Sequence, residues 1–268
     1  MGAKEKLIEI FHHNIKGLIP DTDEMNARHD GRKGHWLEDK FSIHHNASNS
    51  ADIFGFELKN ETTSKTTFGD WSANEYIYKN PAYSDIFNKT KVIENRDVFL
   101  SIFGKSNAEK GGRYSWSGEP CPKISGYNRY GQRLVITENK DIIAEYSYSH
   151  DTRENKQSIV PVILQKESLI LARWYGEKTP EGKRGKCLKS KLENKFNDKG
   201  WFTCKTNNDG KYCKICFGKP MTFDNWIDLV ATGIVFFDSG MYQGNARPYS
   251  EWRANNSFWD SLITETFE

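Results

Sequence analysis

The sequence lacks a large net charge and long apolar runs, two features that would indicate its protein class directly. Its 268 residues hold 38 Lys and Arg against 36 Asp and Glu, so the formal net charge is only +2. This near-balance excludes a histone-like polycation and an acidic disordered protein. The mean hydropathy is −0.75 and the longest apolar run lies near residues 229–237, which excludes a helix that spans a membrane.

Signals for export and anchoring are also missing. The five cysteines are an odd number spread over a long chain, which is not typical of a secreted disulfide framework. The first residues lack the apolar core of a secretory signal, and Lys6 stands where a myristoylation signal has Ser or Thr. We therefore predict an intracellular, cytoplasmic protein with no membrane partner.

The residues that are present are enough for a packed core. Hydrophobic residues make up 37% and aromatic residues 13% of the chain, which fits one large domain or two small ones. Periodicity predicts helices over residues 7–20, 35–45, 188–196 and 222–231. It predicts strands over residues 51–60, 98–103, 133–136, 142–148 and 233–238, with a hairpin over 201–217. This mixture predicts an α/β (α+β) fold in which helices flank a central mixed sheet.

One stretch carries groups that are suited to chemistry. Glu38, Asp52, Glu57 and Lys59 place three carboxylates and one lysine within 22 residues. Alternation along a strand puts Glu57 and Lys59 on the same face. Mg²⁺ prefers oxygen ligands, so Asp52, Glu57 and the backbone carbonyl of Leu58 form a candidate metal site.

The lysine and the first glutamate have separate candidate roles. Lys59 can hold the attacking water and offset the charge of a phosphorane-like transition state. Glu38, on the preceding predicted helix, can orient Lys59 or hold a second metal ion. The alternative is an exposed strand on which acidic and basic residues alternate, because a Glu-x-Lys tripeptide alone is a weak signal.

The wider context of these residues resembles a known enzyme family. Residues 34–38 (Gly-His-Trp-Leu-Glu), Asp52 and residues 55–59 (Gly-Phe-Glu-Leu-Lys) resemble the MvaI/BcnI-type restriction endonucleases and the mismatch-repair nuclease MutH, within the PD-(D/E)xK superfamily. Ala51 stands where that signature has proline. The resemblance implies a PD-(D/E)xK nuclease-like fold, the catalytic residues Glu38, Asp52, Glu57 and Lys59, and one or two Mg²⁺ ions per active site.

A second block of the sequence resembles the DNA-reading segment of the same family. It runs from Phe237 through a glycine-containing loop to Arg253, although the histidines of the family have no match here. Arginine can pair bidentately with guanine, and Gln or Asn can address adenine. The candidate DNA-binding residues of this block are Gln243, Asn245, Arg247, Tyr249 and Arg253. Two Arg-aromatic clusters upstream add Arg113, Arg129 and Tyr130. The alternatives are a solvated polar loop for the C-terminal set and packed loop anchors for the upstream clusters.

Two further patterns, a basic stretch and a group of cysteines, concern binding of DNA and of zinc. Residues 176–219 contain twelve Lys or Arg against five Asp or Glu, an excess of +7 that is densest over 183–191. Such a stretch can neutralise DNA phosphates or form a solvated helix face. Cys187, Cys204, Cys213 and Cys216 can supply four zinc thiolates, but they include only one CxxC pair and also suit a hairpin strand.

Together these patterns predict a Mg²⁺-dependent type II restriction endonuclease of a bacterium or archaeon. The resemblance implies hydrolysis of double-stranded DNA at a short pseudopalindromic site of the CC-N-GG kind, 5′-phosphate ends, action as a monomer, and a cognate DNA methyltransferase as a functional partner. We expect a catalytic lobe over residues 1–110 and a DNA-recognition lobe over 111–268. The alternatives are a MutH-like nicking nuclease that needs a protein activator, a DNA-binding protein with an inactive nuclease core, and a zinc-ribbon binder.

Overall fold

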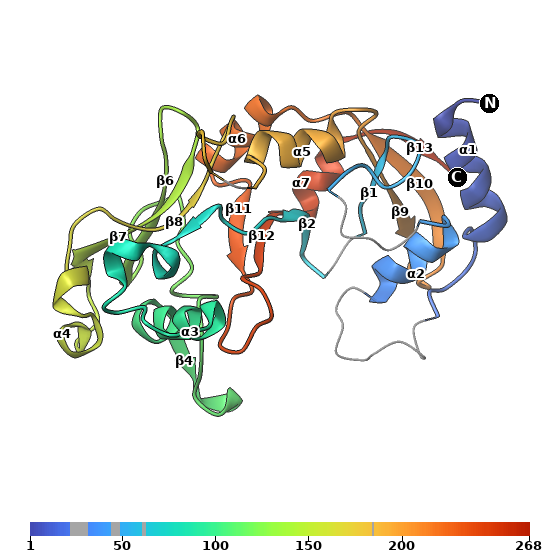
Figure 1. Ribbon diagram of the computed structural model, residues 1–268. Coiled ribbons are helices and arrows are strands. Elements are labelled where there is room, and N and C mark those ends of the chain that lie inside the picture. The colour runs from blue at the N-terminus through green and yellow to red at the C-terminus, as the bar shows by residue number, and fades with distance from the viewer. Residues whose placement is uncertain (22–31, 44–48, 61–62, 184) are drawn as a thin grey trace. The chain divides into compact units, whose positions relative to one another are not determined.

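The computed structural model describes residues 1–21, 32–43, 49–60, 63–183 and 185–268 (Figure 1). The chain forms two compact units that are not continuous in sequence. The first comprises residues 1–67, 191–225 and 254–268, and the second comprises 68–190 and 226–253. The predicted division at residue 110 does not follow these units, because strands from the C-terminal third complete the sheet that carries Glu57. Within the described residues, no helix is long and apolar enough to cross a membrane.

The first unit is built on a mixed four-stranded sheet with the strand order β1-β9-β10-β13. Strand β1 runs parallel to β9, whereas the β9–β10 and β10–β13 pairs are antiparallel. The β9–β10 pair is the hairpin that the sequence predicts. The bounds of these strands are β1 (Glu57–Leu58), β9 (Trp201–Thr206), β10 (Tyr212–Gly218) and β13 (Ile263–Phe267).

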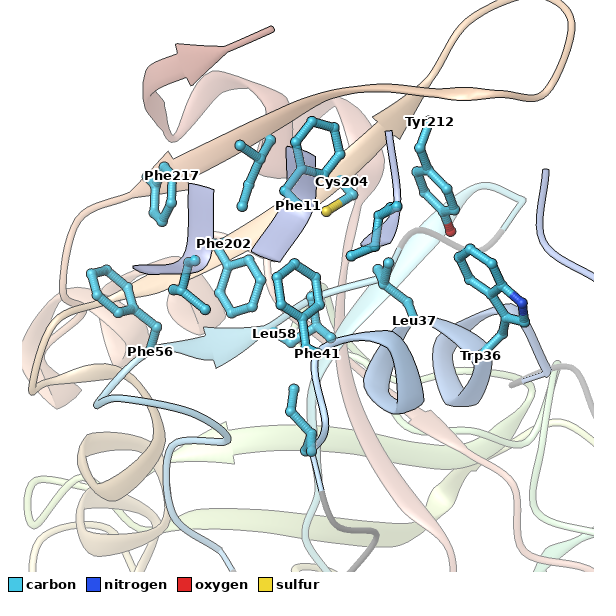
Figure 2. Close-up of a cluster of buried hydrophobic side chains, with 14 residues drawn as sticks. Phe11, Trp36, Leu37, Phe41, Phe56, Leu58, Phe202, Cys204, Tyr212 and Phe217 are labelled. Atoms are coloured by element: carbon cyan, nitrogen blue, oxygen red, sulfur yellow. The ribbon is translucent and has the colours of Figure 1, made fainter. Parts of the chain in front are cut away.

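One face of this sheet packs against α1 (Ala3–Asn14) and α2 (Arg32–Lys40). Figure 2 shows the cluster, in which side chains from the two helices meet those of β1, β9 and β10. The Phe202 ring lies at its centre, with its centroid 5.0 Å from that of Phe41 and 6.5 Å from that of Phe56. Burial of these rings is the main force that holds β1 in place, since a two-residue strand has few backbone hydrogen bonds of its own.

Two other helices contact side chains on the opposite face of this sheet. These are α5 (Leu188–Phe196) and α7 (Asn256–Ser261). The Trp259 ring packs edge-on against Trp201 of β9, with the centroids 5.0 Å apart, and also lies beside Phe196. This second face therefore has aromatic walls, and it is the face toward which Glu57 and Lys59 point.

The second unit contains an antiparallel sheet with the order β3-β8-β7-β6 and a two-stranded ribbon, β4-β5. The predicted pairing of residues 133–136 with 142–148 is present in the β6–β7 hairpin. A third sheet, β11-β12-β2, includes strands that extend across the bounds of the two units. The strands are β2 (Lys65–Asp70), β3 (Glu75–Tyr76), β4 (Lys105–Asn107), β5 (Arg113–Ser115), β6 (Tyr130–Ile136), β7 (Ile142–Asp151), β8 (Leu169–Trp174), β11 (Phe236–Ser239) and β12 (Ser250–Asn255).

The remaining helices include one clear correction to the sequence prediction. The run over residues 98–103 was expected to be a strand, but it is the C-terminal half of helix α3 (Val92–Phe103). Periodicity alone cannot separate a buried strand from a buried helix in so short an apolar run. The remaining α-helices are α4 (Lys156–Ile159) and α6 (Phe223–Ala231), and the 3₁₀ turns are η1 (Ile77–Lys79), η2 (Pro81–Tyr83), η3 (Ala108–Lys110) and η4 (Val162–Leu164).

Candidate active site

The pleat of β1 positions two of the predicted catalytic side chains. Phe56 and Leu58 enter the hydrophobic cluster, so Glu57 and Lys59 project from the opposite face. Pairing with the parallel segment is held by backbone hydrogen bonds from Glu57 N to Gly200 O (3.0 Å) and from Lys59 N to Phe202 O (2.8 Å). Both residues are buried, at 2% exposed for Glu57 and 7% for Lys59.

Asp52 reaches the same place through a tight turn before β1. Ile53 and Phe56 form a bridge around Phe54 and Gly55, both of which have positive φ angles. The turn brings the Asp52 carboxylate back to the strand, where its Oδ2 accepts a hydrogen bond from Leu58 N (2.9 Å). A side chain at Gly55 would collide with Asp198, so this left-handed position suits glycine on two counts.

The turn places the Asp52 carboxylate in an unfavourable environment for its charge. As a residue Asp52 is exposed, but the atoms packed around its carboxylate desolvate it, and this desolvation, followed by repulsion from Glu57, raises its pKa to about 6, although Lys59 and Lys195 act in the opposite direction. A carboxylate held in this way is suited to a divalent ion, because the ion would compensate the charge that desolvation penalises.

Two lysines converge on a single oxygen of Glu57. The Nζ atoms of Lys59 and Lys195 each lie 2.8 Å from Glu57 Oε1. Burial on its own would raise the pKa of Glu57, but the two ammonium groups outweigh it and lower that pKa. The pKa of Lys59 is also lowered, because burial outweighs the attraction of Glu57.

The second oxygen of Glu57 is left for another partner. Among the residues that the structure describes, Glu57 Oε2 is buried and accepts no hydrogen bond. Buried polar atoms are nearly always paired, so an acceptor of this kind points to an absent cation or donor. Together with Asp52 and the carbonyl of Leu58, it fits the oxygen donor set of a hard divalent cation that keeps several waters. The described part of the chain holds no group of three or more His, Cys, Asp or Glu arranged for a metal, so two carboxylates would carry the site.

Lys195 is a site residue that the sequence analysis does not single out. It comes from α5, the helix predicted at residues 188–196, and lies 138 residues from Glu57 in the chain. The basic character of that helix was the one available signal, and it does not identify which lysine turns inward.

Glu38 is placed on α2, the helix that packs on the hydrophobic face of the sheet. It is half-buried and follows Leu37, whose side chain lies in the same cluster as Leu58. The structure thus brings together Asp52, Glu57 and Lys59, and the role of Glu38 stays a prediction.

The candidate DNA-binding residues near the C-terminus gather around the loop between β11 and β12 in the second unit. Gln243 is fixed to β5, since its N–H donates to Tyr114 O (3.0 Å) and its Oε1 accepts from Tyr114 N (2.8 Å). Asn245 is buried and accepts from Tyr242 N. The guanidinium of Arg113 lies 3.7 Å from the ring centre of Tyr242, a residue that the sequence analysis does not select. These contacts hold the loop in shape, which prepares it for recognition.

Arg247 and Tyr249 form the outer part of this loop. The guanidinium of Arg247 stacks 4.3 Å from the ring centre of Tyr249 and lies 2.7 Å from Asp70 Oδ2. Its side chain is 51% exposed. Within the loop it is therefore the predicted arginine that is accessible to a nucleic acid.

The other predicted arginines have different surroundings. Arg253, on β12, is paired with Glu251 and lies 3.5 Å from Asp238, so two carboxylates hold it. Arg129 is exposed and 4.0 Å from Glu119. Tyr130 is buried below the guanidinium of Arg153, at 4.8 Å, as the loop-anchor alternative predicts. DNA contact by these three residues stays a prediction.

The basic stretch is partly neutralised within the protein. Lys183 is exposed and lies 2.6 Å from Glu75, while Arg184 lies outside the described residues. Residues 176–190 are assigned to the second unit and residues 191–219 to the first, with the division inside helix α5.

The zinc alternative gains no support from the hairpin that carries three of the four cysteines. All five cysteines are free thiols, and Cys204 and Cys216 are buried in β9 and β10. Burial raises the pKa of Cys204, which opposes the thiolate form that zinc needs. No metal-binding cysteine cluster is found in the ranges that the structure describes.

Comparison with known proteins places this site in a family. The family model described as LlaMI restriction endonuclease matches residues 15–267. The chain is 60% identical over 264 residues to the type II restriction enzyme ScrFI of Lactococcus lactis subsp. cremoris, covering 98% of this chain and 97% of that protein.

A solved structure agrees with the fold. The chain is similar to the restriction endonuclease MvaI in complex with its cognate DNA substrate, with a TM-score of 0.56 at 15% identity, covering 100% of this chain and 98% of that one. This similarity confirms the predicted PD-(D/E)xK type of mixed α/β fold. The chain therefore belongs to the LlaMI restriction endonuclease family and is a type II restriction enzyme, a site-specific nuclease.

Proposed function

We propose that this enzyme hydrolyses double-stranded DNA with Mg²⁺ held by Asp52, Glu57 and the carbonyl of Leu58. The observation that carries the proposal is the buried, unpartnered Oε2 atom of Glu57 beside an Asp52 whose pKa is raised by desolvation to about 6. When bound, Mg²⁺ would polarise a phosphoryl oxygen and acidify a water in its coordination shell. Type II restriction enzymes as a class use a divalent ion, and the choice of Mg²⁺ is part of this proposal.

The other steps of the hydrolysis are assigned to side chains of the site. Lys59 Nζ orients the attacking water and offsets the negative charge that develops on the phosphate in the transition state. The aromatic wall formed by Phe196, 5.1 Å from Lys59 Nζ, keeps bulk water from the ammonium and strengthens its field. Glu38 orients Lys59 or holds a second ion. In-line attack releases the 3′ oxygen and leaves the 5′-phosphate end.

The second unit supplies sequence recognition in this proposal. The loop between β11 and β12 approaches base edges with Arg247 and Gln243, and Arg113 and Arg129 contact the DNA backbone. The target we propose is a short pseudopalindrome of the CC-N-GG kind, cut by a monomer one strand at a time. This specificity and the monomeric state rest on the family resemblance. In the cell, a methyltransferase of the same specificity would protect the host DNA.

A plasmid digest tests the metal requirement. Wild-type enzyme with Mg²⁺ is expected to give discrete fragments, and EDTA is expected to abolish them because the two carboxylates then lack their ion. Gel electrophoresis followed by end mapping measures both the cleavage and the recognition sequence. Product that stops at nicked circles would favour the MutH-like alternative. Fragments that persist in EDTA would contradict the metal site.

Arg247 offers a test of recognition. Arg247→Ala is expected to weaken binding to the target about 10- to 100-fold, because a bidentate arginine–guanine contact contributes about 1–3 kcal/mol of discrimination. A gel-shift titration in Ca²⁺ would measure the affinity for target and non-target duplexes. Lys110→Ala, at an exposed lysine of η3, serves as the matched charge control. An equal loss on both duplexes would assign Arg247 to the phosphate backbone instead.

A further inference from the structure

Lys195 enters the candidate active site from a helix whose backbone is firmly attached around it. Ala51 N donates to Asn194 O (3.0 Å) and Met221 N donates to Phe196 O (3.2 Å), so hydrogen bonds hold the residues on both sides of Lys195. The Phe196 side chain is fully buried. The position of the Lys195 backbone is therefore fixed, and only its flexible side chain can change place.

The charges of the site balance without any ion. Asp52 and Glu57 contribute two negative charges, and Lys59 and Lys195 contribute two positive charges. Both ammonium groups lie 2.8 Å from the same atom, Glu57 Oε1. A divalent ion held by Glu57 Oε2 and Asp52 would bring two more positive charges beside the carboxylate whose Oε1 these lysines already neutralise. Repulsion then acts on both lysines.

The two lysines differ in their freedom to respond. The Lys59 side chain is 9% exposed and its ammonium lies 5.1 Å from the Phe196 ring centre. The Lys195 side chain is 17% exposed and reaches Glu57 from the end of α5. Four rotatable methylene groups let Lys195 turn toward solvent at little cost, whereas Lys59 is enclosed.

We propose that Lys195 is a built-in competitor of the metal ion, a positioning residue that holds Glu57 in the metal-free enzyme and leaves it when the ion binds. The proposal rests on the metal site proposed above. The released ammonium needs an anion, and the DNA backbone phosphate at the cleavage site is the natural acceptor. Metal and DNA then favour each other's binding, because each relieves the contact that opposes the other.

The test measures metal binding in the absence of DNA. Mn²⁺ binding to the full-length protein is followed by the loss of the free-ion signal in electron paramagnetic resonance. Lys195→Met is expected to bind Mn²⁺ about tenfold more tightly than wild type, the order of effect of one unit charge about 5 Å from a dication under strong screening. Lys195→Gln is a second neutral variant, and Lys195→Arg, which keeps the charge, is expected to stay near wild type.

A matched control distinguishes the loss of the Lys195–Glu57 contact from the loss of a positive charge near the site. Lys199 follows closely in sequence, is exposed, and its N–H donates to Gly55 O (3.1 Å). Lys199→Met removes the same charge near the site without removing a contact to Glu57, so its Mn²⁺ affinity is expected to change by no more than about twofold. A gain in Lys199→Met equal to that in Lys195→Met would overturn the proposal.

Adding target DNA gives the second readout. In wild type, DNA is expected to tighten Mn²⁺ binding, and this gain is expected to shrink in Lys195→Met, where the competitor is already gone. Unchanged or weaker Mn²⁺ binding by both neutral variants would overturn the role of Lys195 while leaving the metal site standing. If Asp52→Asn fails to weaken Mn²⁺ binding, the metal site itself is wrong and the proposal fails with it.

Discussion

Asp52→Asn is expected to lower the cleavage rate by about three orders of magnitude or more. A metal ligand at the reacting phosphate contributes several kcal/mol to the transition state, and each 1.4 kcal/mol is a factor of about ten. Asparagine keeps an oxygen that can accept the hydrogen bond from Leu58 N, so the turn is preserved. Single-turnover cleavage of a labelled duplex measures the loss.

The same substitution has a predicted effect of opposite sign on stability. The pKa of Asp52 is raised to about 6 by desolvation and by Glu57, so above that pH the ionised carboxylate costs folding free energy, an amount that solvent screening keeps small because the residue is exposed. A neutral side chain removes this cost. The melting temperature of Asp52→Asn at pH 8 without metal is therefore expected to equal or exceed that of wild type. A clear drop would show that lost activity reflects lost folding.

A control for this variant is available beside the same turn. Asp198 is exposed and lies against Gly55, so Asp198→Asn removes a nearby carboxylate that is not part of the proposed metal site. It is expected to cleave like wild type. If Asp198→Asn loses as much activity as Asp52→Asn, the specific role of Asp52 is contradicted.

Lys59→Met is expected to lower the cleavage rate by about 10²- to 10³-fold, the usual effect of removing one preorganised charge from a transition state. Methionine is similar in length and apolar, so it suits a position enclosed by Phe196. In the metal-free variant Lys195 still contacts Glu57, so the carboxylate keeps one cation while the site folds. The rate constant under saturating enzyme separates this chemical defect from DNA binding.

Lys205 provides the matched lysine for that experiment. It borders the same small cavity as Lys59, Thr203 and Trp259, but its ammonium pairs with Asp260. Lys205→Met is expected to leave the cleavage rate close to wild type. Equal losses in the two variants would mean that the cavity as a whole, and not the Lys59 charge, limits the reaction.

Local patterns in the sequence predict much of the site. The alternation of Phe56, Glu57, Leu58 and Lys59 fixes which side chains share a face, because the strand period is independent of the rest of the fold. Helix α5 and the β9–β10 hairpin also follow from local signals.

The parts that could not be predicted depend on contacts between distant segments. Lys195 reaches Glu57 only because α5 is bonded to the segment around Ala51. Strand β1 is two residues long, although the apolar pattern extends over residues 51–60, because the turn at Phe54 and Gly55 interrupts it. Helix α3 is not predictable from residues 98–103, because a short apolar run gives the same signal for a helix as for a strand.

The parallel pairing of β1 with β9 also determines when, during synthesis of the chain, the catalytic sheet can form. Glu57 pairs with Trp201, so a nascent chain carries its catalytic strand long before the partner strand exists. At usual rates of synthesis the interval is on the order of ten seconds. A chain that stalls or is degraded within it cannot assemble the sheet that presents Glu57 and Lys59. We therefore expect truncated products of translation to lack cleavage activity.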